Sequence, residues 1–271
     1  MSDEFGYDEP EPARGPDPQI PAARAAVLEL FASSPTQVFF SRQVEVRLEK
    51  EYFHWITNRA IRELVADGEI KGETVKLNTG GEIHLLWPKQ FRYFRRSAKR
   101  VIELVESYSV NSFSRLVGYT GEMLVGDAFA TAQFTRVGRE TRKFAEREWT
   151  TSSHDLDFVV ERDGFAYGVE VKNTLGYMRE EELNIKIAMC EELGVTPLFV
   201  VRYMPATWFN RVREVGGFVL MLKYQLYPLS HVELARAVRE ELGMPVHAPA
   251  ALFDSTLRRF TAWHDDRVNS E

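Results

Sequence analysis

Cysteine is almost absent from this chain of 271 residues, which contains only Cys190. A single thiol cannot form a disulfide within the chain or build a zinc site of several thiolates. No apolar run approaches the ~20 residues that a membrane helix needs, so we expect no membrane partner. The first residues offer neither the basic start nor the apolar core of a secretory signal. A cytoplasmic protein is therefore the default expectation.

Two signatures of small-molecule and metal chemistry are also missing. The chain has no Gly-rich phosphate-binding loop, so no nucleotide cofactor is expected. Its six histidines are scattered, and none pairs with another at the spacing of zinc ligands. The composition is otherwise that of a globular protein, because 44% of the residues are hydrophobic and 27% are charged. This length can bury a core in one domain or in two.

The net charge of −6 is spread unevenly along the chain. Residues 1–19 contain six acids, one arginine and four prolines, a net charge of −5, and we predict that they are disordered. Residues 20–100 contain fourteen basic and nine acidic side chains, a net charge of +5. The remainder, residues 101–271, is acidic, with a net charge of −6. The weak total therefore does not argue against a nucleic-acid partner.

Residues 20–88 show the pattern of a small helical domain followed by a hairpin. Apolar spacing predicts three short helices, and turn residues between two short strands predict a β-hairpin. The helices are expected at 21–31, 41–50 and 54–66, and the strands at 73–77 and 82–87. This order resembles a winged helix-turn-helix domain, which implies that the third helix enters the major groove of DNA.

The outward face of that third helix is the first predicted DNA contact. Its residues can hydrogen-bond phosphates or base edges, and they are His54, Asn58, Arg59 and Arg62. The alternative is a solvated helix face in a winged helix that binds protein.

Residues 89–110 follow as a predicted basic helical connector. The twelve residues 89–100 contain six basic, three aromatic and no acidic side chains. Phosphates are the natural counter-charge for such a run, and aromatic rings can stack on bases. The predicted DNA contacts are Arg92, Arg95, Arg96, Lys99 and Arg100. A solvated helix face is again the alternative.

Residues 111–271 have the pattern of a mixed α/β domain. Expected elements are a helix at 120–130, one or two strands within 133–148, strands at 155–160 and 165–172, a helix at 179–193, and a strand at 197–203. A short helix at 207–215, a strand at 217–227 and a helix at 231–242 are expected to follow. We derive no chemistry from residues 204–271.

The chemistry is concentrated in the predicted hairpin of strands 155–160 and 165–172. Side chains alternate along a strand, so Asp155 and Asp157 share one face, and Glu170 and Lys172 share one face of the next strand. If both polar sets face the same way, carboxylates and an ammonium converge. Carboxylate oxygens are ligands for Mg²⁺ or Mn²⁺, and these metals promote phosphodiester hydrolysis.

This arrangement resembles the PD-(D/E)XK nuclease superfamily, which includes many restriction endonucleases and the archaeal Holliday junction resolvases. Asp157, Glu170 and Lys172 match its motif of an Asp on one strand and Glu-x-Lys on the next. The resemblance spans about residues 115–203 and implies a restriction endonuclease-like sheet flanked by helices. It also implies a metal bound by Asp157 and Glu170, with Lys172 assisting the attacking water.

Two further roles follow from the resemblance. Many members carry another Glu on the preceding helix, where Glu122 lies, and the carbonyl of Val171 is implied as a metal ligand. The Pro that often precedes the Asp is replaced by His154, so Asp155 and Asp157 both remain candidate ligands, with Asp157 favoured. Weaker candidates for substrate contact are Asn173, Asn184 and Lys186.

The interpretation we favour is a metal-dependent DNA nuclease, most simply an endonuclease, whose winged helix and basic connector position the DNA. One alternative is a non-catalytic DNA-binding or regulatory protein with an inert nuclease-like fold. A second is an RNA-cutting site beside a winged helix that binds protein. A homodimer is a further expectation, because cutting both strands usually needs two sites.

Overall fold

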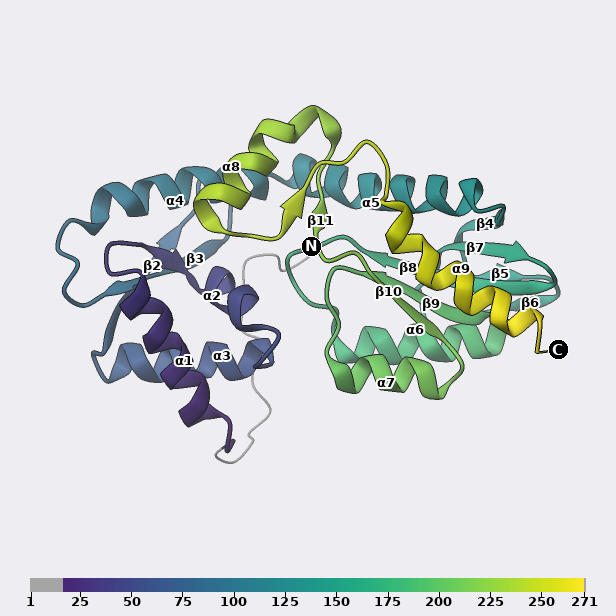
Figure 1. The fold of residues 1–271 in the computed structure, drawn as a ribbon, viewed down its shortest axis with the longest axis horizontal. Helices are drawn as coiled ribbons and strands as arrows, with labels where there is room; N and C mark the ends of the chain where they lie inside the picture. The colour runs from purple at the N-terminus through teal and green to yellow at the C-terminus, as the bar shows by residue number, and fades with distance from the viewer. Residues whose placement is uncertain (1–16, 271) are drawn as a thin grey trace. The chain divides into compact units, whose positions relative to one another are not determined.

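The structure is a computed structural model that describes residues 17–270. Within these residues the chain forms two compact units, residues 17–114 with 233–244, and residues 115–232 with 245–270 (Figure 1). The disorder predicted for residues 1–19 falls outside the described residues except at 17–19. No helix among the described residues is both long and apolar enough to cross a membrane.

The first unit combines helices with a three-stranded antiparallel sheet of order β1-β3-β2. Its helices are α1 (Ile20–Ser33), α2 (Ser41–Leu48), α3 (His54–Ala66), α4 (Phe94–Ser109) and α8 (Val232–Leu242). Its strands are β1 (Phe39–Phe40), β2 (Ile70–Lys76) and β3 (Glu82–Pro88). The three helices and the hairpin predicted for residues 20–88 are present, and the hairpin begins at Ile70, earlier than expected.

The core of this unit follows from the apolar spacing of its helices. In α1 the buried residues are Ile20, Ala23, Val27 and Phe31, which recur at helical period along one face. They pack against α3, which ends where Gly68 adopts a left-handed φ of 71°. The turn of the β2–β3 hairpin uses Gly80 and Gly81, both with positive φ.

Helix α4 begins at Phe94, so the first residues of the predicted basic connector precede the helix. The Phe94 ring stacks on Trp87 of β3 at a centroid distance of 4.0 Å. Helix α8 belongs to this unit although the sequence assigns 111–271 to one domain. Its last carbonyl, of Leu242, accepts a hydrogen bond from the buried Gln43 amide at 2.6 Å.

The second unit is a mixed α/β structure, as the composition and periodicity predict. Its helices are α5 (Asn111–Thr131), α6 (Glu180–Leu193), α7 (Ala206–Glu214), η1 (Leu229–His231) and α9 (Asp254–Val268). Its strands are β4 (Thr135–Thr141), β5 (Lys143–Phe144), β6 (Arg147–Glu148), β7 (Leu156–Arg162), β8 (Phe165–Lys172), β9 (Thr196–Val201), β10 (Phe218–Met221), β11 (Gln225–Leu226) and β12 (Val246–His247).

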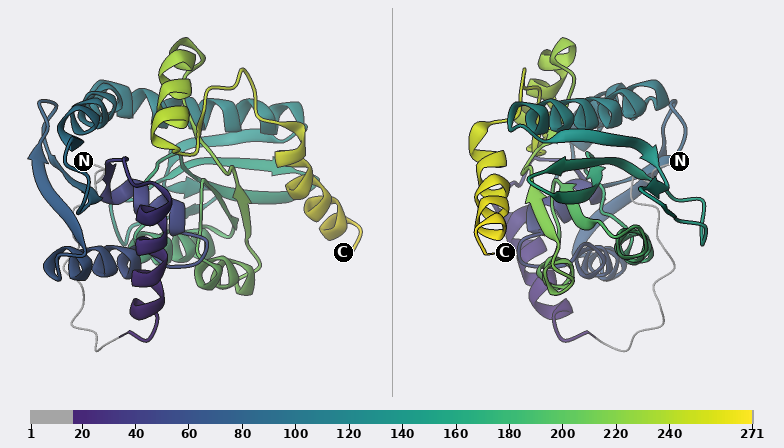
Figure 2. Two further views of the ribbon diagram at one scale, coloured as in Figure 1. Left: turned by 60° about the vertical axis from the view of Figure 1, so that its left-hand side comes forward. Right: turned by 90° about the vertical axis from the view of Figure 1, so that its right-hand side faces the viewer.

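A five-stranded sheet of order β10-β9-β8-β7-β4 organises this unit. Strands β4, β7 and β8 are antiparallel neighbours, whereas β8, β9 and β10 run parallel through the crossover helices α6 and α7. Helices α6 and α7 cover one face of the sheet, and α5 and α9 lie on the other (Figures 1 and 2). Two short ladders, β5–β6 and β11–β12, lie outside this sheet.

Each face of the sheet has its own apolar cluster. The face under α5 and α9 buries Phe129, Phe158, Val169 and Phe260 among others. The face under α6 buries Val159, Cys190 and their neighbours. Glycine is required at position 168, because a Cβ there would lie 2.7 Å from Sγ of Cys190. This close approach fixes the distance between α6 and the middle of β8.

Candidate active site

The β7–β8 hairpin brings the predicted acids together. Its antiparallel register pairs Phe158 with Val169, so Asp157, which precedes Phe158 on β7, lies beside Glu170, which follows Val169 on β8. The Oδ2 atom of Asp157 accepts a hydrogen bond from the main-chain N–H of Val171 at 2.6 Å. The hairpin turn at residues 163–164 has positive φ at both positions, as the sequence Asp-Gly favours. The antiparallel pairing therefore places Asp157 against the strand that carries the Glu-x-Lys motif.

Glu170 and Lys172 share one face of β8, as the alternation of a strand predicts. The Nζ atom of Lys172 lies 3.0 Å from Oε1 of Glu170. Val169 and Val171 point to the opposite face and join its apolar cluster. Because the Glu170 side chain is only 3% exposed, its charge depends on neighbouring cations for compensation.

Helix α6 supplies two more charged groups to this cluster. The Nζ atom of Lys186 lies 2.5 Å from Oε2 of Glu170, and it also donates to the main-chain carbonyl of Asp155. The Oε1 atom of Glu182 lies 2.6 Å from Nζ of Lys172. The sequence rated Lys186 a weak candidate and missed Glu182. Their i, i+4 spacing, which puts both on one face of α6, is the signal that could have found them.

Burial sets the electrostatics of these groups. Burial and the charge of Glu170 raise the pKa of Asp157 to about 7, against the Val171 N–H and Lys186, which favour its ionised form. Burial alone would lower the pKa of Lys172, but the carboxylates of Glu170 and Glu182 outweigh it and raise that pKa. The site thus contains an acid that ionises reluctantly and an ammonium that stays charged.

The two other predicted acids lie at the margin of this cluster. Glu122 is on α5, and burial raises its pKa while the charge of Arg139 acts in the opposite direction. The main chain of Asp155, just before β7, binds Lys186. Among residues 17–270 no group of three or more His, Cys, Asp or Glu side chains is placed to bind a metal ion. The structure therefore brings Asp157 and Glu170 together, but neither Glu122 nor Asp155 completes a three-ligand set.

Asn173 explains how α5 is fixed beside the end of β8. Its amide donates to the carbonyls of Val117 and Leu226, at 2.7 Å each, and its Oδ1 accepts from the N–H of Leu226 at 2.6 Å. Gly121 allows this contact, because a Cβ there would lie 2.6 Å from Cβ of Asn173. The buried Asn173 therefore has a structural role, and its predicted contact with substrate stays a prediction. Asn184 is exposed and accepts a hydrogen bond from Arg211.

A divalent metal fits the donors that remain. Carboxylate oxygens are hard ligands, and Mg²⁺ typically takes one or two carboxylates and completes its shell with water and substrate phosphate. Asp157 and Glu170 supply such a pair. Burial, followed by the charge of Glu170, raises the pKa of Asp157, and a bound cation would compensate the charge of the ionised pair. The role predicted for the Val171 carbonyl stays a prediction, while its N–H binds Asp157.

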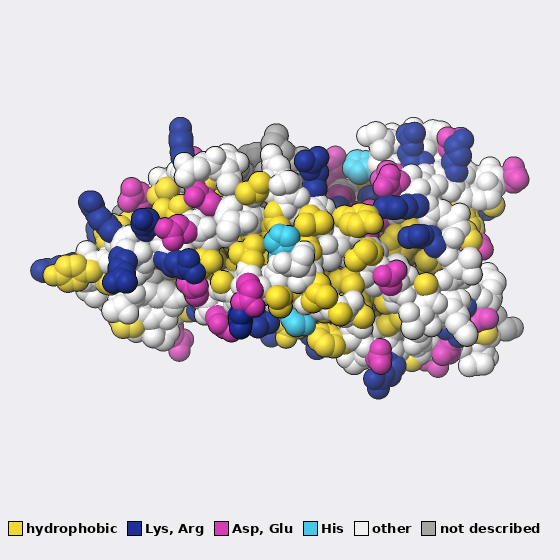
Figure 3. Space-filling view, turned by 90° about the horizontal axis from the view of Figure 1, so that it is seen from above, with side chains coloured by type: hydrophobic (Ala, Val, Ile, Leu, Met, Phe, Trp, Pro, Cys, Tyr) yellow, Lys and Arg dark blue, Asp and Glu magenta, His cyan; other side chains and the backbone are white. Residues whose placement is uncertain are grey.

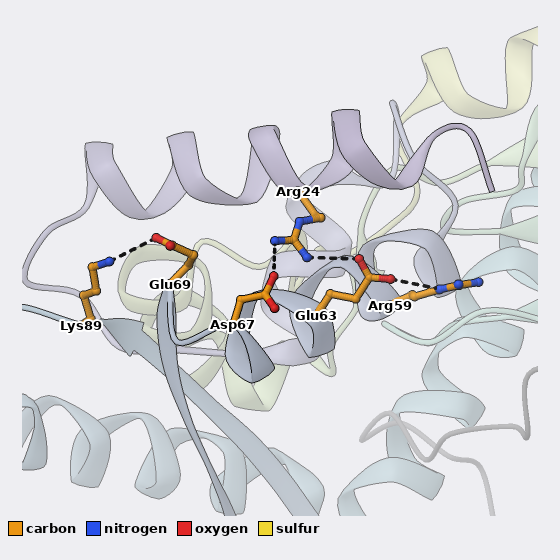
Figure 4. Close-up of polar contacts among 6 residues, drawn as sticks. All are labelled: Arg24, Arg59, Glu63, Asp67, Glu69 and Lys89. Carbon is orange, nitrogen blue, oxygen red and sulfur yellow. Dashed lines mark hydrogen bonds and ion pairs between the residues drawn. The ribbon is translucent and has the colours of Figure 1, made fainter. Parts of the chain in front are cut away.

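The predicted DNA-binding face of α3 is largely engaged within the first unit. Asn58 donates to Glu45 at 3.0 Å, and Nε of Arg59 lies 3.3 Å from Glu63. Glu63 also binds Arg24 of α1 at 3.1 Å (Figure 4).

His54 and Arg62, the other two residues predicted to contact DNA from α3, differ in exposure. His54 is half-buried, and burial together with the charge of Arg42 lowers its pKa to about 3, so it stays neutral. Arg62 is exposed. The structure thus leaves Arg62 as the exposed member of this face.

The basic residues around the start of α4 divide into two groups. Arg92, Arg95 and Arg96 are exposed, and none forms an ion pair with another residue in 17–270. Lys99 and Arg100 instead have acidic partners, Glu103 on α4 and, for Arg100, Glu241 on α8 at 2.5 Å. Figure 3 shows Lys and Arg side chains gathered at its left-hand end, with a few acids among them.

Comparisons of the chain with family models, curated proteins and solved structures gave no match. What the two candidate regions can do therefore follows from their own geometry and charge.

Proposed function

We propose that this protein is a metal-dependent nuclease that hydrolyses phosphodiester bonds in DNA. The observation that carries the proposal is the placement of Asp157, Glu170 and Lys172 around one hairpin. Asp157 is fixed by the Val171 N–H at 2.6 Å, and Glu170 is fixed by Lys172 at 3.0 Å. Two carboxylates and one ammonium are the groups that metal-assisted hydrolysis of a phosphodiester needs.

The side chains would divide the work by their positions. Asp157 and Glu170 would bind Mg²⁺ or Mn²⁺, which when bound polarises the phosphate and lowers the pKa of a coordinated water. Lys172 is 30% exposed at its side chain, so its ammonium can reach a phosphate oxygen or orient the attacking water. Glu182 keeps this ammonium in place through its 2.6 Å ion pair.

The start of α4 supports DNA as the substrate of this site. Arg92, Arg95 and Arg96 present three exposed guanidinium groups that lack acidic partners among the described residues. Tyr93, which lies between them in the sequence, is 87% exposed, and its ring can stack on a base. We therefore assign backbone contact to this segment, within the winged-helix arrangement that its unit resembles. Homodimerisation, which would bring two sites to the two strands, remains part of the proposal.

Conversion of supercoiled plasmid to nicked and linear forms tests the activity. We expect wild type to cut with Mg²⁺ or Mn²⁺ and not with excess chelator. Lys172→Ala should cut at least ~100-fold more slowly, because it loses charge stabilisation at the phosphate. The matched control is Lys143→Ala, since Lys143 also pairs with a glutamate but is 66% exposed on β5. Equal and undetectable cleavage by all three proteins would remove the nuclease proposal.

One observation favours a second function, a non-catalytic DNA-binding protein. Both oxygens of Glu170 already have an ammonium partner, Lys172 on one and Lys186 on the other. A site neutralised in this way can be purely structural. Binding to duplex that survives in the absence of any cleavage would support this function, and tighter binding to RNA than to DNA would indicate an RNA substrate.

A further inference from the structure

Glu170 is bound by two lysines that differ in burial and in their other partners. Lys172 is 30% exposed at its side chain, and its Nζ is shared between Glu170 at 3.0 Å and Glu182 at 2.6 Å. Lys186 is 5% exposed, and its Nζ lies 2.5 Å from Oε2 of Glu170. It also donates to the main-chain carbonyl of Asp155, just before β7. Lys186 therefore connects α6 to both strands that carry the acids.

Building on the proposed function, we propose that Lys186 is the built-in counter-charge of the metal site. Its ammonium compensates the charge at Oε2 of Glu170, and so leaves Oε1 as the oxygen that can exchange Lys172 for a divalent cation. Lys172 retains Glu182 as its partner after that exchange. Because Lys186 is buried, it acts through Glu170 and does not contact the substrate.

This division of roles follows from the cost of burying charge. An ionised carboxylate as deeply buried as Glu170 is stable only when cations or hydrogen-bond donors compensate it. Removing Lys186 deprives Oε2 of its partner and leaves surplus negative charge in the site. A divalent cation that binds the folded state then compensates more charge than it does in wild type. Since ligands of the folded state stabilise it by mass action, Mg²⁺ should stabilise the variant more than the wild type.

Thermal unfolding of the full chain, with chelator and with excess Mg²⁺, tests this inference without measuring activity. The variants are Lys186→Met and Met189→Ala. Met189 lies on the same helix and is fully buried in an apolar cluster, so its truncation lowers stability without touching Glu170. We expect the Mg²⁺-induced rise in Tm to be larger in Lys186→Met than in either other protein by roughly 3 °C or more. Equal rises in the two variants would overturn the inference, because a merely structural lysine predicts them.

A double variant covers the case in which Lys186→Met does not fold. Combining Glu170→Gln with Lys186→Met removes both charges, and we expect it to fold and to melt above Lys186→Met. A double variant no more stable than Lys186→Met would show that the two side chains are not coupled, and would overturn the inference.

The outcome for the proposed function is read separately, from plasmid cleavage by wild type. A wild type that never cuts, together with a larger Mg²⁺ response in Lys186→Met, would remove the nuclease and keep Lys186 as the counter-charge of a metal site.

Discussion

Glu170 and Glu63 are each bound by two cations, and they differ in burial. In the second unit, Glu170 lies between Lys172 and Lys186, and its side chain is 3% exposed. In the first unit, Glu63 binds both Arg24 and Arg59, and its side chain is 38% exposed. Water screens the second arrangement, whereas the first must compensate its charges internally. The same pattern of ion pairs is therefore a buried cluster in one unit and a surface feature in the other.

The largest expected effect comes from breaking the buried arrangement. Glu170→Gln leaves two ammonium groups without their shared carboxylate, and we expect a loss of about 3–5 kcal/mol in the free energy of unfolding. Urea unfolding at neutral pH measures this loss. A change below about 1 kcal/mol would mean that Glu170 is as well screened as an exposed residue, and the contrast with Glu63 would fail.

The pH dependence of stability sharpens the contrast through Asp157. Its pKa of about 7 in the folded protein lies above the ~3.9 of an aspartate in an unfolded chain. Between these values the folded state keeps a proton that the unfolded state has released, so this contribution to stability is full below about pH 4 and is lost as pH rises towards about 7. The free energy of unfolding of wild type minus that of Asp157→Asn should therefore fall by at most about 4 kcal/mol as pH rises from about 4 to about 7.

An exposed carboxylate provides the control of opposite sign. The hydrogen bond from Arg100 lowers the pKa of Glu241, so its contribution is present above the unfolded pKa and is lost as pH falls. Urea unfolding of wild type, Asp157→Asn and Glu241→Gln across the pH range measures both slopes. Finding the same sign for Asp157 and Glu241 would contradict the electrostatics assigned to the hairpin.

The arginines of the first unit should contribute differently to DNA binding, according to whether each has an acidic partner. Replacing Arg92, Arg95 and Arg96 together by alanine should weaken duplex binding and reduce the slope of log K against log salt by up to about 3. Arg59→Ala should leave that slope nearly unchanged, because Arg59 is paired with Glu63. Fluorescence anisotropy over a salt series measures both. An equal reduction of this slope in the two variants would support the DNA contact that the sequence predicts for α3.

The smallest expected effect is that of Glu63→Gln. Both of its ion pairs are partly exposed, so we expect a loss of no more than about 1 kcal/mol in the free energy of unfolding. The same urea titration used for Glu170→Gln provides the comparison. A loss of about 3 kcal/mol or more would show that exposure does not separate the two arrangements.

The sequence was most informative where chemistry depends on local periodicity. Alternation along two strands and the turn between them was enough to place Asp157 beside Glu170 and to put Lys172 on the same face. The mixed α/β class and the helices of residues 20–66 follow from apolar spacing in the same way. These features involve residues that are close in sequence or joined by a tight turn.

Features that depend on distant packing were not accessible. Lys186 on α6 pairs with Glu170 on β8, and α6 also approaches β8 closely at Gly168, where a Cβ would lie 2.7 Å from Sγ of Cys190. The partners of the α3 residues come from α1 and α2 as well as α3, so no pattern within α3 shows that its polar face is engaged. Helix α5 begins at Asn111, nine residues before the predicted start, because its packing overrides the low helix propensity of glycine at 118 and 121.

Plasmid cleavage by wild type, Asp157→Asn and Glu63→Gln tests the central claim most directly. Asp157→Asn removes the proposed metal ligand without burying new charge, so the variant should be at least as stable as wild type at pH 7. We predict that wild type and Glu63→Gln nick supercoiled DNA equally well with Mg²⁺, and that the folded Asp157→Asn protein is slower by at least ~100-fold. Equal rates for wild type and Asp157→Asn, or no cleavage by wild type with either Mg²⁺ or Mn²⁺, would contradict the claim that this hairpin is a nuclease site.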